Sequence, residues 1–268
     1  MSAPVWLVTG AGSGVGRTLA LALAASGAEV ILTARNRSRL EETAQRAGSS
    51  SVVLPADLSD VGSLDGLAGE VGKRLAGRPL AGIVHAAGVM LWDSPSTAAG
   101  WSLVPWVNAL APWRLTLNLE PLLLAGSGSR VLFVAGAPFT LKGIHPDPSH
   151  WKGAQKGRGL TLALESAAAK VLMVRSLHDR WGGRAAAFAF DPGFVKSHLA
   201  GGLPFPLNAL GFIAQPFLSA RSGNAEFLAL DPAALTLSGS LVSGRRAVPD
   251  CPFPKEKASE EAFFALLE

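Results

Sequence analysis

The chain has 268 residues, enough for one large α/β domain or two small ones with a full core. Hydrophobic residues make up 49% and charged residues 16%, a globular composition that excludes a disordered chain. The net charge of +4 is spread thinly, with no run of five or more basic residues. The charge pattern therefore gives no support for binding to nucleic acid.

Cysteine, histidine and apolar patterns exclude several further classes. Cys251 is the only cysteine, which excludes an internal disulfide and a multi-cysteine metal site. The five histidines show no HExxH or other dense ligand spacing, so we expect no metal. The N-terminus has no signal-peptide pattern, and the apolar stretch 202–220 is interrupted by prolines and an asparagine. We expect a cytoplasmic protein with no membrane span.

Short apolar or β-branched runs alternate with segments of helical length along the chain. Strands are predicted at residues 5–9, 29–33, 51–54, 81–85, 130–135, 185–190 and 238–242. Helices are predicted at residues 14–25, 38–47, 61–75, 101–124 and 160–181. This alternation predicts an α/β fold, a doubly wound parallel sheet of about seven strands with helices on both faces. There is no internal repeat or linker, so residues 1–268 are expected to form one domain.

A glycine-rich string, "TGAGSGVG", joins the first predicted strand to the first predicted helix. Gly10, Gly14 and Gly16 permit a tight turn and let backbone N–H groups approach a pyrophosphate, whose charge the helix N-terminus favours. The spacing is TGxxxGxG, because Val15 stands where the GxGxxG fingerprint has a glycine. Its position between strand and helix predicts a dinucleotide-phosphate site.

Four more motifs follow in order. With "TGAGSGVG" (residues 9–16), they are "ADL" (56–58), "HAAG" (85–88), "VNALAP" (107–112) and "DPGFVKS" (191–197). This set resembles the short-chain dehydrogenase/reductase family, and "KVLMVRSLHDRW" and the C-terminal third resemble its retinol-dehydrogenase-like branch. The resemblance implies a single Rossmann-like, dinucleotide-binding domain of an oxidoreductase. The implied cofactor-binding residues are Thr9, Gly10, Ser13, Gly14, Val15, Gly16, Arg35, Arg37, Asp57, Leu58, Ala86, Ala87, Gly88, Pro192, Gly193, Val195 and Ser197.

The residues after the second strand bear on the choice of cofactor. An NAD enzyme has a carboxylate there for the ribose hydroxyls, and this chain has Ala34. Arg35 and Arg37 follow, and guanidinium groups suit a 2′-phosphate. The other interpretation is that both arginines belong to a solvated helix start. The pattern favours NADP(H).

The family resemblance also implies a catalytic Ser, a Tyr, a Lys four residues later, and an Asn. Alignment without gaps puts Gly136 at the Ser, Ala163 at the Tyr and Ala167 at the Lys, so only Asn108 is retained. The chain contains no tyrosine at all. We expect these positions to line an open, apolar cavity.

Other residues are candidates for the missing acid. A register shifted by three puts Ser166 at the Tyr and Lys170 at the Lys, or Lys170 reaches back from its own turn of the helix. The loop 138–159 and the segment after the PG turn supply Thr140, His145, His150, Lys152, Lys156 and His198. A surface side chain without catalytic duty is the other interpretation of each.

Three functions stay open. The first is an NADP(H)-dependent oxidoreductase acting on a lipophilic carbonyl or alcohol without the Ser-Tyr-Lys relay. The second is a non-catalytic NADP(H)-binding sensor or partner protein, and the third is a non-redox cyclase or isomerase on the same scaffold. The apolar stretch 201–220 matches the family's substrate lid, or else packs in the core or a dimer. We expect a homo-oligomer, a dimer or tetramer.

Overall fold

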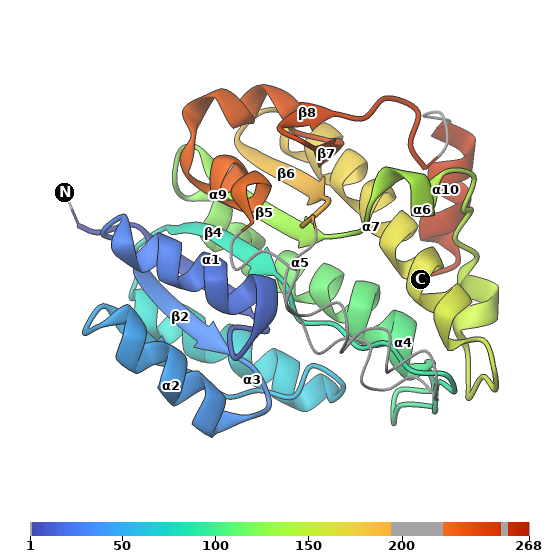
Figure 1. The fold of residues 1–268 in the computed structure, drawn as a ribbon, viewed down its shortest axis with the longest axis horizontal. Helices are drawn as coiled ribbons and strands as arrows, with labels where there is room; N and C mark the ends of the chain where they lie inside the picture. Colours follow the sequence, from blue (N-terminus) through green and yellow to red (C-terminus); the bar gives the residue numbers. More distant parts are fainter. Residues whose placement is uncertain (1, 194–221, 253–256, 268) are drawn as a thin grey trace.

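An eight-stranded sheet forms the centre of the protein (Figure 1). The computed structural model describes residues 2–193, 222–252 and 257–267. The strands are β1 (Val5–Thr9), β2 (Glu29–Thr33), β3 (Ser51–Val53), β4 (Leu80–His85), β5 (Ser129–Val134), β6 (Ala185–Phe190), β7 (Ser240–Ser243) and β8 (Arg246–Ala247). Their order is β3-β2-β1-β4-β5-β6-β7-β8, parallel except for β8. The strand order reverses between β1 and β4, and such a switch point is where doubly wound sheets bind ligands.

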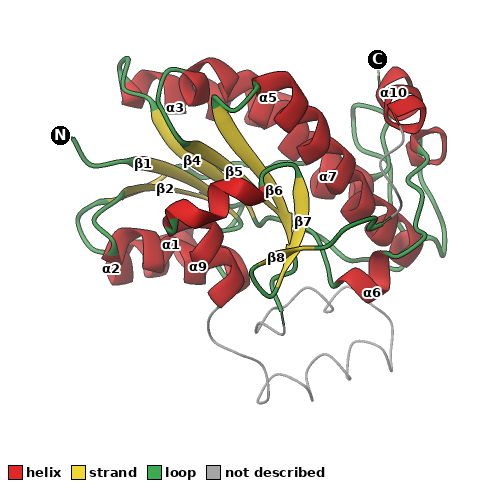
Figure 2. Cartoon of the chain, turned by 90° about the horizontal axis from the view of Figure 1, so that it is seen from above, coloured by secondary structure: helices red, strands yellow, loops and turns green. Residues whose placement is uncertain are grey.

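Helices cover both faces of the sheet. They are α1 (Gly14–Ala25), α2 (Arg37–Ala47), α3 (Val61–Leu75), α4 (Leu103–Pro105), the π-helix η1 (Trp106–Leu110), α5 (Ala111–Leu124), α6 (Pro138–Leu141), the 3₁₀-helix η2 (Pro148–Trp151), α7 (Gly159–Trp181), α9 (Gly223–Leu230), the 3₁₀-helix η5 (Pro232–Leu237) and α10 (Lys257–Ala265). Figure 2 shows α1, α2 and α9 on one face and α3, α5 and α7 on the other. Each face has its own apolar cluster. The predicted single Rossmann-like domain is confirmed.

Five predicted elements match residue for residue: β1, β2, β6, α1 and α3. The strand count is one short, because β8 has two residues, too few to show any periodicity. The helix predicted at 101–124 is present from Leu103 to Leu124, but it is not one α-helix, because the five residues of η1 separate α4 from α5. Pro112 has no N–H, so it cannot donate to the carbonyl of Asn108, and the chain forms the π-helix η1 before α5 begins.

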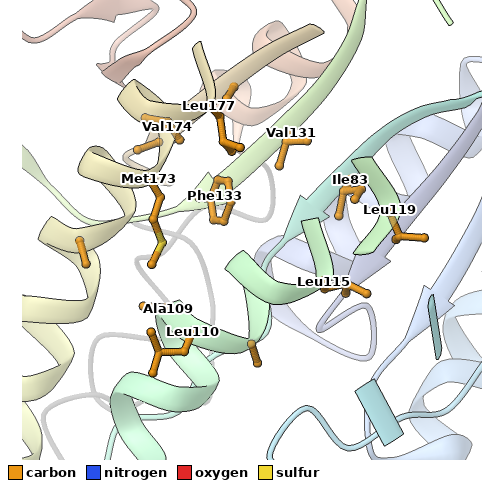
Figure 3. Close-up of a cluster of buried hydrophobic side chains, with 14 of the residues drawn as sticks. Ile83, Ala109, Leu110, Leu115, Leu119, Val131, Phe133, Met173, Val174 and Leu177 are labelled. Atoms are coloured by element: carbon orange, nitrogen blue, oxygen red, sulfur yellow. The ribbon is translucent and has the colours of Figure 1, made fainter. Parts of the chain in front are cut away.

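The larger apolar cluster fixes α5 and α7 against the sheet (Figure 3). Met173 and Leu177 of α7 lie beside Phe133 of β5, and Leu115 and Leu119 of α5 belong to the same cluster. All five are fully or almost fully buried, and each such side chain contributes roughly 1.5–3 kcal/mol. This packing sets the rotation of α7 and so the face on which the family's catalytic positions lie.

Some predicted features lie outside the described residues. They are the lid 201–220 together with Val195, Ser197 and His198. Within the described residues, no helix combines the length and apolar character needed to cross a membrane.

Candidate functional site

A cleft of about 490 Å³ opens at the carboxyl ends of β1 and β4, at the switch point of the sheet. Twelve of the residues predicted to bind the cofactor line it: Gly10, Ser13, Gly14, Val15, Arg35, Asp57, Leu58, Ala86, Ala87, Gly88, Pro192 and Gly193. Nine further residues complete the wall: Ala34, Arg39, Ala56, Val89, Met90, Leu91, Leu103, Val107 and Val134. The five motifs, far apart in sequence, thus meet at one place.

The glycine-rich turn is built by close backbone approach. Gly10 has φ +66°, and a Cβ there would lie 2.6 Å from the backbone N of Ala87. A Cβ on Gly16 would lie 2.5 Å from the carbonyl O of Gly10, so neither position accepts a side chain. Gly16 therefore acts beneath the cleft surface. The N-cap Ser13 makes no side-chain cap and the first turn of α1 carries no acid, which leaves that end suited to phosphate.

Two side chains that the motifs did not reveal brace this turn. Arg17 donates from Nη2 to the carbonyl of Gly12 at 2.6 Å and from Nη1 to Oε1 of Glu42 at 2.8 Å. Thr43 Oγ1 donates to the carbonyl of Ala11 at 3.0 Å. Both connections link α2 to the turn, and their spacing in sequence offers no signal that would predict them.

Thr9, a predicted cofactor contact, is fully buried and does not line the cleft. Its Oγ1 accepts from the backbone N of Ala86 at 3.1 Å and of Ala87 at 3.2 Å. Thr9 therefore ties the end of β1 to the segment after β4 and shapes the cleft from behind.

At the β2 end of the cleft, two guanidinium groups stand beside Ala34. Arg35 lines the cleft as expected, and the second lining arginine is Arg39 and not Arg37. The Arg37 side chain is 66% exposed and faces Glu41, with 3.7 Å between Nη1 and Oε1. Arg35 lies just before α2 and Arg39 lies in its first turn, and both line the same end of the cleft.

Asp57 lines the same end of the cleft. Its Oδ1 accepts from the backbone N of Ser59 at 2.9 Å and from Ser59 Oγ at 2.8 Å. These bonds fix the carboxylate at the start of the loop before α3. Next to it, the carbonyl of Leu58 accepts from Trp106 Nε1 at 2.9 Å, which links this loop to η1.

The residues that alignment puts at the catalytic Ser, Tyr and Lys positions lie apart from the cleft lining. None of Gly136, Ala163 and Ala167 lines the cleft. Ala167 is 7% exposed within the larger apolar cluster, and Ala163 packs against that cluster. A Cβ on Gly136 would lie 3.5 Å from Thr140 Oγ1, an ordinary contact, so a small side chain fits there.

Asn108, the retained position, is engaged with the backbone. Its Oδ1 accepts from Val89 N at 2.8 Å and its Nδ2 donates to Val89 O at 2.9 Å. Both ends of the amide are therefore used, and Asn108 holds the segment after "HAAG" against η1. Its side chain shapes the wall of the cleft.

Lys170 lies one turn beyond the family's Lys position and is 7% exposed. Its Nζ donates to the carbonyl of Val134 at 2.7 Å, and burial lowers the pKa of Lys170 to about 8. Ser166 is fully buried and donates to the carbonyl of Leu162, away from the cleft. The shifted register therefore supplies no proton donor at the Tyr position.

The loop between β5 and α7 supplies no acid to the cleft either. Thr140, His145, His150, Lys152 and Lys156 are all absent from the residues that line it. Lys152 places its ammonium 3.3 Å from the ring centroid of Trp101, and His150 lies 3.5 Å from Oδ2 of Asp147. The described titratable groups in the wall are Arg35, Arg39 and Asp57, all at the β2 end.

A sequence model described as short chain dehydrogenase matches residues 4–138. The chain belongs to the short-chain dehydrogenase family. Members of this family bind a nicotinamide cofactor, and the match ends just after Gly136, the residue that alignment puts at the catalytic Ser position.

Curated relatives support the membership. The chain is 29% identical to a Streptomyces protein assigned as a daunorubicin C-13 ketoreductase, over 91% of this chain and 84% of that one. It is 31% identical to a mouse polyprenol dehydrogenase, over 73% and 61%. It is 30% identical to human retinol dehydrogenase 12, over 73% and 62%. The chain thus spans about three fifths of the length of the last two.

Solved structures share the fold. A short chain dehydrogenase from Salmonella enterica serovar Typhi superposes with a TM-score of 0.68 at 22% identity, over 90% of this chain and 95% of that one. A Pseudomonas aeruginosa RhlG complex with NADP gives 0.63 at 21% identity, over 90% and 94%. At 21–22% identity these superpositions show a shared fold.

Proposed function

We propose that this protein binds NADP(H) and acts as an atypical oxidoreductase on a lipophilic carbonyl or alcohol without the Ser-Tyr-Lys relay. The observation that carries the cofactor assignment is the cleft itself. It brings twelve of the expected cofactor-binding positions together around a glycine turn that has no room for side chains. An uncapped helix N-terminus beside that turn suits the pyrophosphate.

NADP(H) is preferred over NAD(H) because of the β2 end of the cleft. Ala34 offers no carboxylate to ribose hydroxyls, whereas Arg35 and Arg39 offer two guanidinium groups to a 2′-phosphate. A metagenomic short-chain oxidoreductase of the same fold, with a TM-score of 0.57, is known in complex with NADP. That likeness agrees with the assignment.

The opposite end of the cleft suits an apolar substrate. Its wall there includes Met90, Leu91, Leu103, Val107 and Val134. The cofactor supplies a hydride when bound, and the described residues orient it and keep the wall apolar. The proton for the substrate oxygen then comes from water or from the substrate, since no described acid lines this end. Relatives named as retinol and polyprenol dehydrogenases agree with a lipophilic substrate.

A second candidate, a non-catalytic NADP(H)-binding sensor or partner protein, is favoured by one observation. All described titratable groups of the cleft lie at the β2 end, where they serve binding. General acid–base help contributes about 10²–10⁴ in rate, and its usual provider is missing here.

Two measurements test the proposal. Calorimetric titration with NADPH and NADH should give tighter binding of NADPH, and equal affinities would overturn the cofactor assignment. NADPH oxidation against a panel of lipophilic aldehydes and ketones should then be slow but above a no-enzyme control. Turnover equal to that control across the panel, with NADPH bound, would overturn the oxidoreductase and favour the sensor or the non-redox enzyme. Light scattering on the same sample checks the expected homo-oligomer.

A further inference from the structure

A buried cation lies behind the wall of the cleft. Lys170 sits in the middle of α7 and its Nζ donates to the carbonyl of Val134 at 2.7 Å. Val134 is the last residue of β5 and lines the cleft. The ammonium group therefore contacts a residue of the cleft wall from behind, on the side away from the ligand space. Lys170 is itself 7% exposed, so water screens its charge poorly.

No described acid neutralises this charge. Burial alone accounts for the lowered pKa of Lys170, with no contribution from a carboxylate. On α7 itself, Glu165 accepts from Trp151 Nε1 at 2.8 Å, and Arg175 lies 3.8 Å from Glu260. Among the described elements that pack on α7, η1, α4, α6, β6 and β7 carry no Asp, Glu, Lys, Arg or His.

Among the described residues, the titratable group that responds to the charge of Lys170 is His85, at the end of β4, and it is neutral. Burial first, and then the charge of Lys170, lower the pKa of His85 to about 3. Thr116 Oγ1 donates to the carbonyl of Pro112 at 2.9 Å, so it accepts from His85 Nε2 at 2.8 Å. The proton is thereby assigned to Nε2. Within the part of the chain that the structure describes, Lys170 is then the single charge in this region of the interior.

The charge lies at a defined end of the cleft. Ala34, Arg35 and Asp57 mark the end for the adenosine, and the glycine turn marks the phosphates. Val134, Pro192 and Gly193 lie beyond the glycine turn, on the β5 and β6 side. The ring of a dinucleotide laid along this cleft therefore meets the Val134 end. This step rests on the proposed NADP(H) binding.

We propose that Lys170 makes the site select the redox state of its ligand, binding NADPH in preference to NADP⁺. The nicotinamide ring carries a positive charge when oxidised and none when reduced. A buried ammonium near the ring therefore repels the oxidised form only. At an effective dielectric of about 20 and a separation of about 10 Å, the repulsion corresponds to an affinity ratio of about tenfold.

The preference for NADPH over NADP⁺ should decrease as the pH rises. The ammonium is charged below about pH 8 and neutral above it, because the pKa of Lys170 is lowered to about 8. The ratio of the dissociation constants of NADP⁺ and NADPH should therefore be largest near pH 7 and fall toward its uncharged value by pH 9.5. Titration of the 2′-phosphate affects both ligands alike, so it cancels in the ratio.

The experiment is calorimetric titration of the full chain with NADPH, NADP⁺ and 2′,5′-ADP at pH 7 and pH 9.5. Lys170→Met removes the charge at similar length. Lys73→Met is the matched control, because the Lys73 side chain is 77% exposed and pairs with Glu70 on α3, away from the cleft. We expect the wild type and Lys73→Met to prefer NADPH over NADP⁺ at pH 7 and to lose this preference at pH 9.5. Lys170→Met should lack the preference at both pH values.

The outcomes separate the two proposals. Failure of all three ligands to bind would overturn the proposed function itself. If 2′,5′-ADP and NADPH bind but the ratio of the NADP⁺ and NADPH dissociation constants does not change with pH, the role of Lys170 is overturned and the proposed function stands. If Lys170→Met does not fold, the pH series of the wild type and Lys73→Met decides alone.

Discussion

The cofactor half and the catalytic half of the site differ in how much of the family's pattern they retain. The cofactor half, from the glycine turn to Gly88, keeps its backbone geometry down to the closest contacts, such as Gly10 against Ala87. In the catalytic half, alignment puts Gly136, Ala163 and Ala167 at the Ser, Tyr and Lys positions; none of the three carries a hydroxyl or ammonium group, and they pack against the apolar core. Binding a dinucleotide depends on backbone N–H groups and tight turns, whereas the proton relay depends on three side chains. One can therefore be lost while the other persists.

The largest effect is expected from restoring the catalytic half. The triple variant Gly136→Ser, Ala163→Tyr, Ala167→Lys should raise NADPH-dependent carbonyl reduction by about 10²–10⁴-fold. Space at Gly136 allows the serine, and 163 and 167 lie on one face of α7. Steady-state kinetics on a lipophilic ketone measures the gain.

The matched control carries Phe in place of Tyr at Ala163 and keeps the other two changes, so it lacks one hydroxyl only. Equal rates for both variants would show that the site was rebuilt and cannot be restored. The new lysine at Ala167 lies one turn from Lys170, and adding Lys170→Met relieves that repulsion.

The cofactor half should be most sensitive to substitution at Gly10, where the backbone contact is tightest. Gly10→Ala places a Cβ 2.6 Å from the backbone N of Ala87 at a positive φ, which should cost about 2–4 kcal/mol of folding free energy and abolish NADPH binding. Gly77→Ala is the control, since Gly77 also has a positive φ (+88°) but nothing within 4 Å of its Cβ. It should cost about 1 kcal/mol and leave binding intact. Urea denaturation and calorimetry compare the two, and similar losses would contradict the close-contact argument.

The β2 end of the cleft gives a smaller, selective effect. Arg35→Ala should weaken NADPH binding by about 1–3 kcal/mol and leave NADH unchanged, because only NADPH carries the 2′-phosphate. Arg37→Ala is the control, since Arg37 is exposed and faces Glu41. Calorimetric titration of both variants with both cofactors separates them. A larger loss for Arg37→Ala would reverse the assignment of the two residues.

The same contrast explains what the sequence could predict. The glycine turn, "ADL" and "HAAG" are contiguous motifs at strand ends, so their positions follow from chain order and topology. Leu103, Val107 and Val134 reach the cleft through the packing of α4, η1 and β5, which no local pattern reveals. For Lys170 the sequence left open a reach toward the catalytic position or a solvated side chain, yet Lys170 lies in a stretch, residues 166–174, with no other charge. That uniformly apolar surrounding is the signal of a buried helix segment.

The last and smallest effect concerns stability, because the catalytic half also carries a buried charge. At pH 7, Lys170→Met should stabilise the fold by about 1 kcal/mol. Lowering the pKa of Lys170 from 10.5 to about 8 corresponds to about 3 kcal/mol against folding. The substitution recovers this, but it leaves the Val134 carbonyl without its donor, which costs about 1–3 kcal/mol.

The effect should reverse with pH. Between about pH 8 and 10.5 the unfolded chain holds a proton on Lys170 that the folded chain has released, so the stability of the wild type rises with pH across this window. Near pH 10 the neutral amine still bonds Val134 without the cost of a buried charge, and the wild type should then be the more stable form. Urea denaturation of both proteins at pH 7 and pH 10 measures the crossover. A difference between them that stays constant over this range would show that the Lys170 ammonium is not desolvated in the folded protein.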